Sequence, residues 1–462
     1  MLRAALLLLV YAWAALAEAP VYVVLWFDTE DYVEPAADDA ALRIARDLTA
    51  VGVRGTFKVV GEKARTLERR GRTDVIRALS LHDIGYHSEY HSVPPTPAVY
   101  LREFGYADGA AEFQRREGQG ARDVERIFGI TPSCYGQPGS SWGPQANLAL
   151  RRMGIRVYLD EGEQVGLGEQ PFWYGGLLYA FNMGRFGTRA SLEAKVPLQA
   201  SVDAFDRAAA ELARRGGGLI SIYYHPTEFV TTEFWDGVNF SRGRYTAPGE
   251  WKMPHRRTAE DSERCYNLLR RYVEHAVKVP GVRFVTAHDL LQVYGSPQPP
   301  KVDAAAVRRH LQAGITFLDT PQGALSASEQ LQVLLGLPPR FVEGPSERRA
   351  STYRGTTMPR AVFDRAVRDA AAFIEGRRAL PPMVWAGSEF LSLADFTATL
   401  AGDDGASANV PVRPGALLFE QYFSKDARAA FRWPIHPDGF APAELLELGR
   451  LQGWTLKTAH LR

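Results

Sequence analysis

Two histidines, His87 and His91, have a spacing that suits metal binding. Residues four apart face the same side of a helical turn, so both imidazoles can bind one divalent cation. Two surface histidines that bind no metal can have the same spacing. A metal site would therefore also need a nearby oxygen ligand. A carboxylate would complete a site with positions open for water and substrate. Such a site predicts a hydrolase that activates water with a metal.

An acidic run, Asp28–Asp31, is the expected source of that oxygen ligand. It ends the first predicted strand, where alternation puts Asp28 and Glu30 on one face. Three carboxylates within four residues repel one another unless they share a cation or a proton. The alternative for this run is a solvated acidic turn that caps the following helix.

Two more segments carry candidate residues. His225 follows a predicted buried strand, where its imidazole is suited to act as a general acid. Tyr135, Pro138 and Trp142 belong to a glycine-rich loop that could wall a groove and let a sugar approach the backbone. Trp235 opens an aromatic segment whose rings are candidates for stacking on sugars. A small hydrophobic cluster under a long loop is the alternative there.

The elements that must position these residues alternate between strand and helix. We expect strands at 21–27, 55–60, 83–87, 156–159, 218–224 and 282–286, and helices at 38–51, 73–81, 120–128, 202–215 and 258–278. This order predicts parallel βαβ units, and therefore a sheet or a (β/α) barrel with helices outside. Most candidate residues lie where strands end, which in a barrel is the face that carries the active site.

The chain changes in character at a turn-rich break, Ser296–Pro300. Beyond it the sequence is rich in Ala and Leu, with helical spacing at 303–313, 326–335, 359–375, 392–401 and 441–452. A chain of 462 residues is long enough for two or three domains. We therefore expect a catalytic domain at 18–298 and a mainly helical accessory region at 301–462.

The N-terminus has the layout of a secretory signal peptide. Arg3 precedes an apolar run, Ala4–Leu16, and a small-x-small cleavage site ends at Ala17. The run is shorter than the roughly 20 apolar residues of a membrane-spanning helix. We expect cleavage at residue 17, a secreted or periplasmic location and no stable membrane insertion of the mature protein.

Composition excludes some partners. The 54 Lys and Arg residues and 53 Asp and Glu residues leave a formal net charge of +1, so nothing predicts a nucleic-acid partner. Cys134 and Cys265 are too few for a disulfide framework, and their spacing does not suit a zinc site. Whether they pair is open, as is the oligomeric state.

Together these motifs resemble the polysaccharide deacetylase family, carbohydrate esterase family four, over about residues 20–295. The segment His87–His91 is similar to the family's His-Ser/Thr-x-x-His motif, and Phe27–Asp31 loosely resembles its Thr-Phe-Asp-Asp-Gly motif. Gly55–Phe57 resembles the family's Ala-Thr-Phe-Phe strand, and Val282–Thr286 resembles its last barrel strand.

The resemblance implies a distorted (β/α) barrel in an exported hydrolase that removes acetyl groups from N-acetylated or O-acetylated glycans. It implies a divalent metal such as Zn²⁺, bound by His87, His91 and an acidic residue. By the same resemblance, Asp28 is the general base and His225 donates a proton to the leaving group.

The sequence departs from the family pattern in two places. Its first motif is one residue longer than the family's adjacent acidic pair, so the third ligand is Glu30, which shares a face with Asp28, or else Asp31. An arginine that orients the base is missing, because Gly136 or Gln137 stands at its place. Either another cation substitutes, activity is modest, or the barrel is a non-catalytic carbohydrate-binding protein. A hydrolase of some other small amide is a further alternative.

Overall fold

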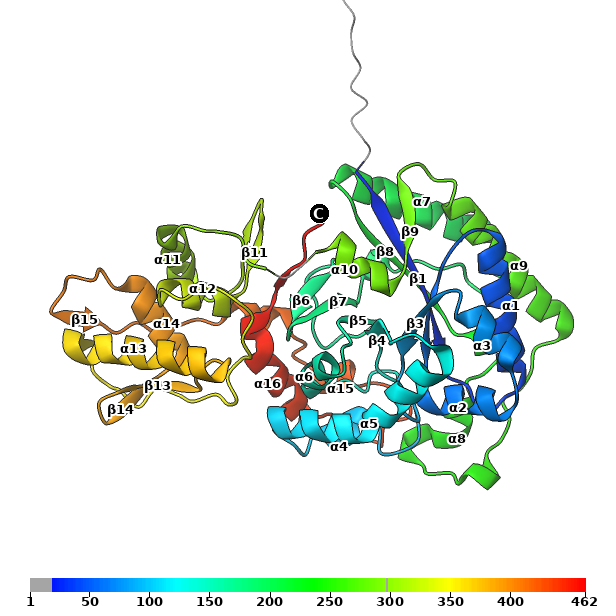
Figure 1. Cartoon of the computed structure of the whole chain (residues 1–462), viewed down its shortest axis with the longest axis horizontal. Helices are drawn as coiled ribbons and strands as arrows, with labels where there is room; N and C mark the ends of the chain where they lie inside the picture. The colour runs from blue at the N-terminus through cyan, green and yellow to red at the C-terminus, as the bar shows by residue number, and fades with distance from the viewer. Residues whose placement is uncertain (1–18, 296–297) are drawn as a thin grey trace, which may run out of the picture.

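A curled sheet of parallel strands forms the core of the larger part of the molecule (Figure 1). The computed structural model describes residues 19–295 and 298–462, so the expected signal peptide at 1–17 lies outside the described residues. Seven strands lie side by side in the order β7-β5-β4-β3-β2-β1-β8, and β9 also pairs with β1. The strands are β1 (Val21–Thr29), β2 (Thr56–Val59), β3 (Asp83–Tyr86), β4 (Cys134–Tyr135), β5 (Val157–Asp160), β7 (Leu177–Phe181), β8 (Gly218–Tyr224) and β9 (Val282–Val285).

The two ends of the curled sheet meet, so that it approaches a closed barrel. A parallel bridge joins Gly187, which follows β7, to Ser221 in β8, and the Thr188 N–H donates to the Ser221 carbonyl at 3.0 Å. Two antiparallel strands, β6 (Phe172–Tyr174) and β16 (Lys457–Thr458), extend the sheet beyond β7. The predicted distorted (β/α) barrel is confirmed.

The composition of β1 explains its central place. Its residues Val21–Phe27 are nearly all buried, as expected for a parallel strand covered on both faces. Helices cover the outside of the barrel (Figure 1). They are α1 (Ala36–Ala50), α2 (Gly61–Arg69), α3 (Thr73–Leu79), α4 (Pro97–Leu101), α5 (Tyr106–Phe128), α6 (Gln145–Arg152), α7 (Leu198–Arg214), α8 (Trp235–Phe240), α9 (Ala259–Ala276) and α10 (Ala287–Val293).

Helix α5 is much longer than the segment 120–128 that the sequence predicts. Its glycines hide the helical pattern, because glycine ordinarily weakens a helix. Gly120 is required by a close approach, since a Cβ there would overlap the Glu89 carboxylate. Gly109 packs in the same way against the Gln145 side chain. The glycines thus mark places where α5 lies close to its neighbours.

The chain beyond residue 300 begins with a separate lobe, on the left of Figure 1. The predicted helices are present as α11 (Ala304–Ala313), α12 (Ala327–Leu334), α13 (Arg360–Arg377) and α14 (Leu393–Gly402). Three antiparallel strand pairs, not predicted from the sequence, join them: β10 (Leu318–Thr320) with β11 (Gly323–Leu325), β12 (Thr357–Pro359) with β15 (Asn409–Pro411), and β13 (Met383–Ala386) with β14 (Glu389–Ser392). Strands of three or four residues are too short to show an alternating pattern.

The last part of the chain returns to the barrel. Gln164 donates to the Ala430 carbonyl at the end of α15 (Ala427–Ala430), and the Tyr174 hydroxyl donates to the Gly449 carbonyl of α16 (Ala443–Gln452). Strand β16 pairs with β6. A buried ion pair, Lys457 Nζ to Glu329 Oε1 at 2.8 Å, joins β16 to α12 of the lobe. Lobe and barrel are therefore joined through a common core.

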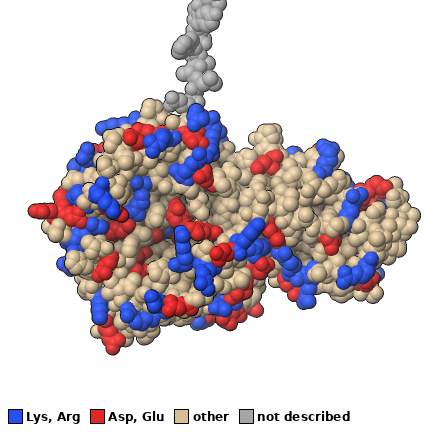
Figure 2. Space-filling view, turned by 180° about the vertical axis from the view of Figure 1, so that it is seen from behind, with Lys and Arg blue, Asp and Glu red and all other residues tan. Residues whose placement is uncertain are grey.

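The molecular surface carries both signs of charge. Figure 2 shows Lys and Arg intermixed with Asp and Glu over the face in view. In the described part of the chain, no helix combines the length and hydrophobicity needed to cross a membrane. Cys134 and Cys265 are both buried, and neither forms a disulfide.

Candidate metal and catalytic site

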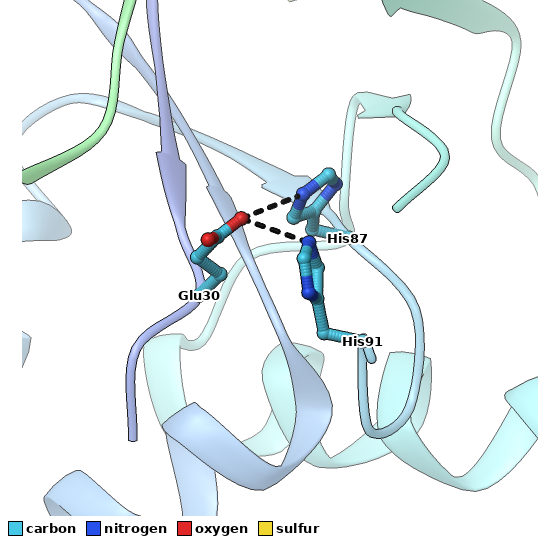
Figure 3. Close-up of side chains that lie close together, drawn as sticks. All are labelled: Glu30, His87 and His91. Atoms are coloured by element: carbon cyan, nitrogen blue, oxygen red, sulfur yellow. Dashed lines mark ion pairs between the residues drawn. The ribbon is translucent and has the colours of Figure 1, made fainter. Parts of the chain in front are cut away.

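Glu30, His87 and His91 converge at one end of the barrel (Figure 3). Glu30 directly follows β1, and the histidines lie in the loop after β3. The Glu30 Oε2 atom is 2.8 Å from His91 Nε2 and 3.5 Å from His87 Nε2, and all three side chains are buried. The structure thus brings together two imidazole nitrogens and a carboxylate, with Glu30 in the place of the third ligand.

Hydrogen bonds on the far side of each imidazole fix which nitrogen faces this group. His87 Nδ1 lies 2.9 Å from the Gly136 carbonyl, which can only accept, so Nδ1 carries the proton. The Ser92 hydroxyl donates to Asp236 Oδ2 at 3.0 Å and therefore accepts from His91 Nδ1. With each imidazole neutral and Nδ1 carrying its proton, both Nε2 atoms would direct a lone pair toward Glu30, the arrangement usual for metal-ligating histidines.

A divalent cation fits this donor set. The buried His87 Nε2 has no hydrogen-bond partner, and the lone pair of His91 Nε2 faces a carboxylate oxygen. Acceptor atoms this close need a shared cation or proton. Zn²⁺ binds His nitrogen and carboxylate oxygen at about 2.0–2.2 Å, which suits ligand atoms separated by these distances.

The loop that carries the histidines is not the helical turn that their spacing suggests. Ser88 and His91 adopt left-handed backbone conformations, with φ of 69° and 56°. Such conformations are uncommon outside glycine, cost of order 1–3 kcal/mol, and cluster at functional sites. Here they turn the chain sharply, so that both imidazoles face Glu30.

We call Glu30, His87 and His91 the metal group. Asp28 lies beside this group, and its carboxylate pairs with the ammonium of Lys58. Its Oδ1 atom is 2.9 Å from Lys58 Nζ, and His87 Nε2 is 3.5 Å away from the same oxygen. Burial would raise the pKa of Asp28, but nearby positive charge, including that of the Lys58 ammonium, outweighs it and lowers that pKa. Asp28 is therefore an ionised carboxylate aimed at the site, as a general base requires.

The Lys58 ammonium lies against Gly136, one of the two positions at which the sequence lacks the expected arginine. Lys58 comes from β2, is fully buried, and also contacts Asp160 Oδ2 at 3.2 Å and the Leu159 carbonyl at 2.8 Å. A Cβ at Gly136 would overlap Lys58 Nζ, so this ammonium fills space that any larger residue at position 136 would take. Of the alternatives that the sequence left open, substitution by another cation is the one that the contacts support.

His225 stands on the other side of Asp28. Its Nε2 atom is 3.7 Å from Asp28 Oδ2, and its Nδ1 atom is 3.4 Å from Glu228 Oε2. Burial would lower the pKa of His225, but the charges of Glu30 and Glu228 raise it to about 9. Arg189 in turn contacts Glu228 at 3.0 Å. The imidazolium can therefore supply a proton at neutral pH.

Asp31, the alternative ligand, is directed away from the histidines. Its Oδ1 atom accepts hydrogen bonds from the backbone N–H groups of Val33 and Glu34, and its Oδ2 atom accepts from the Thr227 hydroxyl at 2.9 Å. Burial raises the pKa of Asp31 to about 6. These contacts fix the turn after β1 and leave Glu30 as the carboxylate in the metal group.

The four aromatic and proline residues expected to bind substrate do not line the cavity over the site. Tyr135, Trp142 and Trp235 are almost completely buried, and Pro138 is buried in its loop. Trp235 packs behind His91, with ring centroids 6.0 Å apart. Their loops are where the sequence places them, but large apolar side chains there pack inward because burial is favourable.

The cavity itself has a volume of about 510 Å³ and is lined mainly by other residues. Besides the metal group, Asp28 and His225, its walls include Asp160, Glu161, Tyr223, Phe234, Arg432 and Trp433. Asp160 ends β5 and Glu161 follows it, at the carboxyl end of a predicted strand, and that position was the available sequence signal. Trp433 comes from the accessory region, and no local signal links it to the site.

Comparison with solved structures identifies proteins with related folds. A family 4 acetyl xylan esterase from Clostridium thermocellum has 16% identity and a TM-score of 0.32, with 60% of this chain and 93% of that chain covered. A family 4 carbohydrate esterase from Streptomyces lividans has 15% identity and a TM-score of 0.29, covering 57% and 90%. Puue allantoinase has 14% identity and a TM-score of 0.39, covering 61% and 91%.

Two of these neighbours are esterases of the family that the sequence motifs resemble. No protein-family model matches the chain, and no curated protein is similar to it in sequence.

Proposed function

We propose that this protein is a metal-dependent hydrolase that removes acetyl groups from N-acetylated glycans. One observation carries the proposal: a His-His-carboxylate group lies beside a buried, ionised Asp28 and His225, in a single cavity. The motif resemblance and the aromatic side chains of the cavity support an acetylated sugar as substrate.

The residues around the metal group suggest the roles of a hydrolytic site. A bound divalent metal supplies a Lewis acid that polarises the acyl carbonyl. Asp28 takes a proton from the attacking water, since Lys58 keeps its carboxylate ionised and oriented. His225 gives a proton to the departing amine, or to the alcohol of an ester. Glu228 and Arg189 hold His225 in place for that transfer.

The metal group can be tested by metal analysis of the purified full chain. We expect about one Zn²⁺ per chain, and its loss in His87→Ala and in His91→Ala because each removes one of three ligands. His310→Ala is a matched control, because His310 lies in α11 and contacts Gln330 at 2.8 Å, outside the site. Full metal occupancy in both site variants would contradict the assignment.

The hydrolytic role can be tested with Asp28→Asn. We expect this variant to keep its metal but to release acetate from N-acetylglucosamine oligomers about 100- to 10,000-fold more slowly, because the general base is lost. Turnover that stays within a few-fold of wild type would show that Asp28 is not the base. A metal-loaded wild type that releases no acetate from any acetylated sugar would overturn the proposed function.

A further inference from the structure

A short segment of the accessory region crosses the rim of the barrel. We call residues 430–435 the C-terminal strap. Its Trp433 N–H donates to Ser140 Oγ at 3.1 Å, in the loop after β4. Gln164, in the loop after β5, donates from Nε2 to the Ala430 carbonyl at 2.6 Å. Both contacts fix the strap to the side of the barrel where β4 and β5 end.

The other end of the strap is fixed to the segment after β8. The Arg242 N–H donates to the Pro434 carbonyl at 2.9 Å, and the Gly243 N–H donates to the Ile435 carbonyl at 2.8 Å. Ile435 is buried in a cluster with Tyr32 and Trp235, below the metal group. The strap thus bridges loops from opposite parts of the rim. Hydrogen bonds to its backbone atoms hold it at both ends.

The side chain of Trp433, whose backbone N–H is bound to Ser140, walls the cavity next to the metal group. Its indole lies edge-on to the imidazole of His91, with ring centroids 5.6 Å apart and an interplanar angle of 87°. Gly139 makes room for the indole, because a Cβ at that position would overlap the ring. A flat, partly exposed indole in the wall of the cavity is a surface on which a sugar ring can pack.

We infer that the strap, whose Trp433 lines the cavity beside His91, stops a glycan chain from continuing past the metal group on this side. The site then takes the terminal N-acetylated sugar of a chain, which packs against Trp433, and excludes internal sugars of a polymer. The inference rests on the proposed function, since it names which acetylated unit enters the cavity.

Binding of N-acetylglucosamine oligomers of one to six units tests this directly. The metal-loaded Asp28→Asn full chain is titrated with each oligomer by calorimetry. We expect the Kd to stop falling after two or three units and to stay within twofold up to six. In a parallel assay with the wild type, mass spectrometry should find the free amine only on a terminal unit of the hexamer.

Variants of the strap sharpen the test. Trp433→Ala in the Asp28→Asn background should raise the Kd at least tenfold, and Gly139→Ala should act in the same direction because it displaces the indole. Trp385→Ala is the matched control: Trp385 is an exposed tryptophan of the lobe, packed on Phe390, and its removal should leave the Kd unchanged.

Several results would overturn the inference: a Kd that falls with every added unit up to six, amines at internal positions, no binding of any oligomer, or a Trp433→Ala variant whose Kd stays within twofold. Internal deacetylation would leave the proposed hydrolase standing while the inference fails. Terminal binding without acetate release from a metal-loaded wild type would leave the inference standing while the proposed hydrolysis fails.

Discussion

At Asp28, burial and charge act in opposite directions. Removing a carboxylate from water favours its neutral form, and a neutral Asp28 could not accept a proton from water. Lys58 offsets that effect at 2.9 Å, and it is itself buried between Asp28 and Asp160. The lysine also lies over the Trp26 ring, 4.0 Å from its centroid. The Lys58 ammonium therefore contacts both carboxylates and orients Asp28, the proposed general base.

This arrangement predicts a loss of turnover in Lys58→Met. Without the ammonium, Asp28 and Asp160 repel each other and Asp28 shifts from its position, which we expect to lower kcat about 100-fold. KM should stay within a few-fold and the metal should be retained, because Lys58 contacts neither histidine. Steady-state kinetics with metal analysis gives both quantities. A kcat close to wild type would contradict the role given to Lys58.

At the scale of elements, helix α5 supports the loop that holds the metal ligands. Glu117 of α5 accepts a hydrogen bond from the Glu89 N–H at 2.7 Å. The Tyr86 hydroxyl donates to the Glu117 carbonyl at 2.7 Å and lies 3.0 Å from the same carboxyl oxygen. The Tyr100 hydroxyl donates to the other carboxyl oxygen of Glu117 at 3.2 Å. Burial, together with the charge of Glu89, raises the pKa of Glu117 to about 7. The loop is thus held by a carboxyl group that is protonated below neutral pH.

Because its folded pKa lies above the unfolded value near 4.5, Glu117 should make the protein less stable as pH rises from about 4.5 to 7. The folded state keeps the proton in this window while the unfolded state has lost it, so the loss reaches at most about 3 kcal/mol. Glu117→Gln should remove this part of the pH dependence, measured by chemical unfolding at pH 5 and pH 8.

Glu112→Gln is the control on the same helix. Hydrogen bonds from Arg115 and Arg116 lower the pKa of Glu112 to about 2, so its titration falls below pH 5. Its removal should leave the stability difference between pH 5 and pH 8 unchanged. Equal effects of the two substitutions on that difference would contradict the assignment to Glu117.

At the scale of the whole molecule, the lobe and the barrel meet through charged as well as apolar contacts. Lys457 in β16 is buried against Glu329, which also forms the N-terminal capping box of α12 with Ser326. A buried ion pair adds little net stability when intact, but removing one partner leaves an uncompensated charge. The pair therefore makes folding of the lobe depend on β16 being in place.

Lys457→Met should lower the free energy of unfolding by about 3 kcal/mol, because the Glu329 charge stays buried without its counterion. The double variant Lys457→Met/Glu329→Gln should regain most of that loss. Chemical denaturation measures both, and kcat should match wild type, since neither residue lines the cavity. A single variant that loses less than about 1 kcal/mol would contradict this role.

Much of the barrel follows from local patterns, and much of the site does not. Hydrophobic periodicity is local, so β1, β8 and α9 lie close to their predicted ranges. The spacing of His87 and His91 pointed to two side chains that the structure brings together with Glu30, although their loop is not helical. Lys58 gave no signal, because a buried lysine inside a strand has meaning only beside the acids that surround it.

Gly139 and Trp433 form a pair whose members depend on each other although they lie far apart in the chain. Any side chain at 139 would push the indole out, whereas loss of the indole would remove the overlap but not the left-handed backbone, φ of 50°, that favours glycine there. In the evolution of such barrels, Gly139 can therefore be replaced only where Trp433 has also been lost. A glycine at position 139 and a tryptophan at position 433 would mark, from sequence alone, relatives in which the C-terminal strap walls the cavity in the same way.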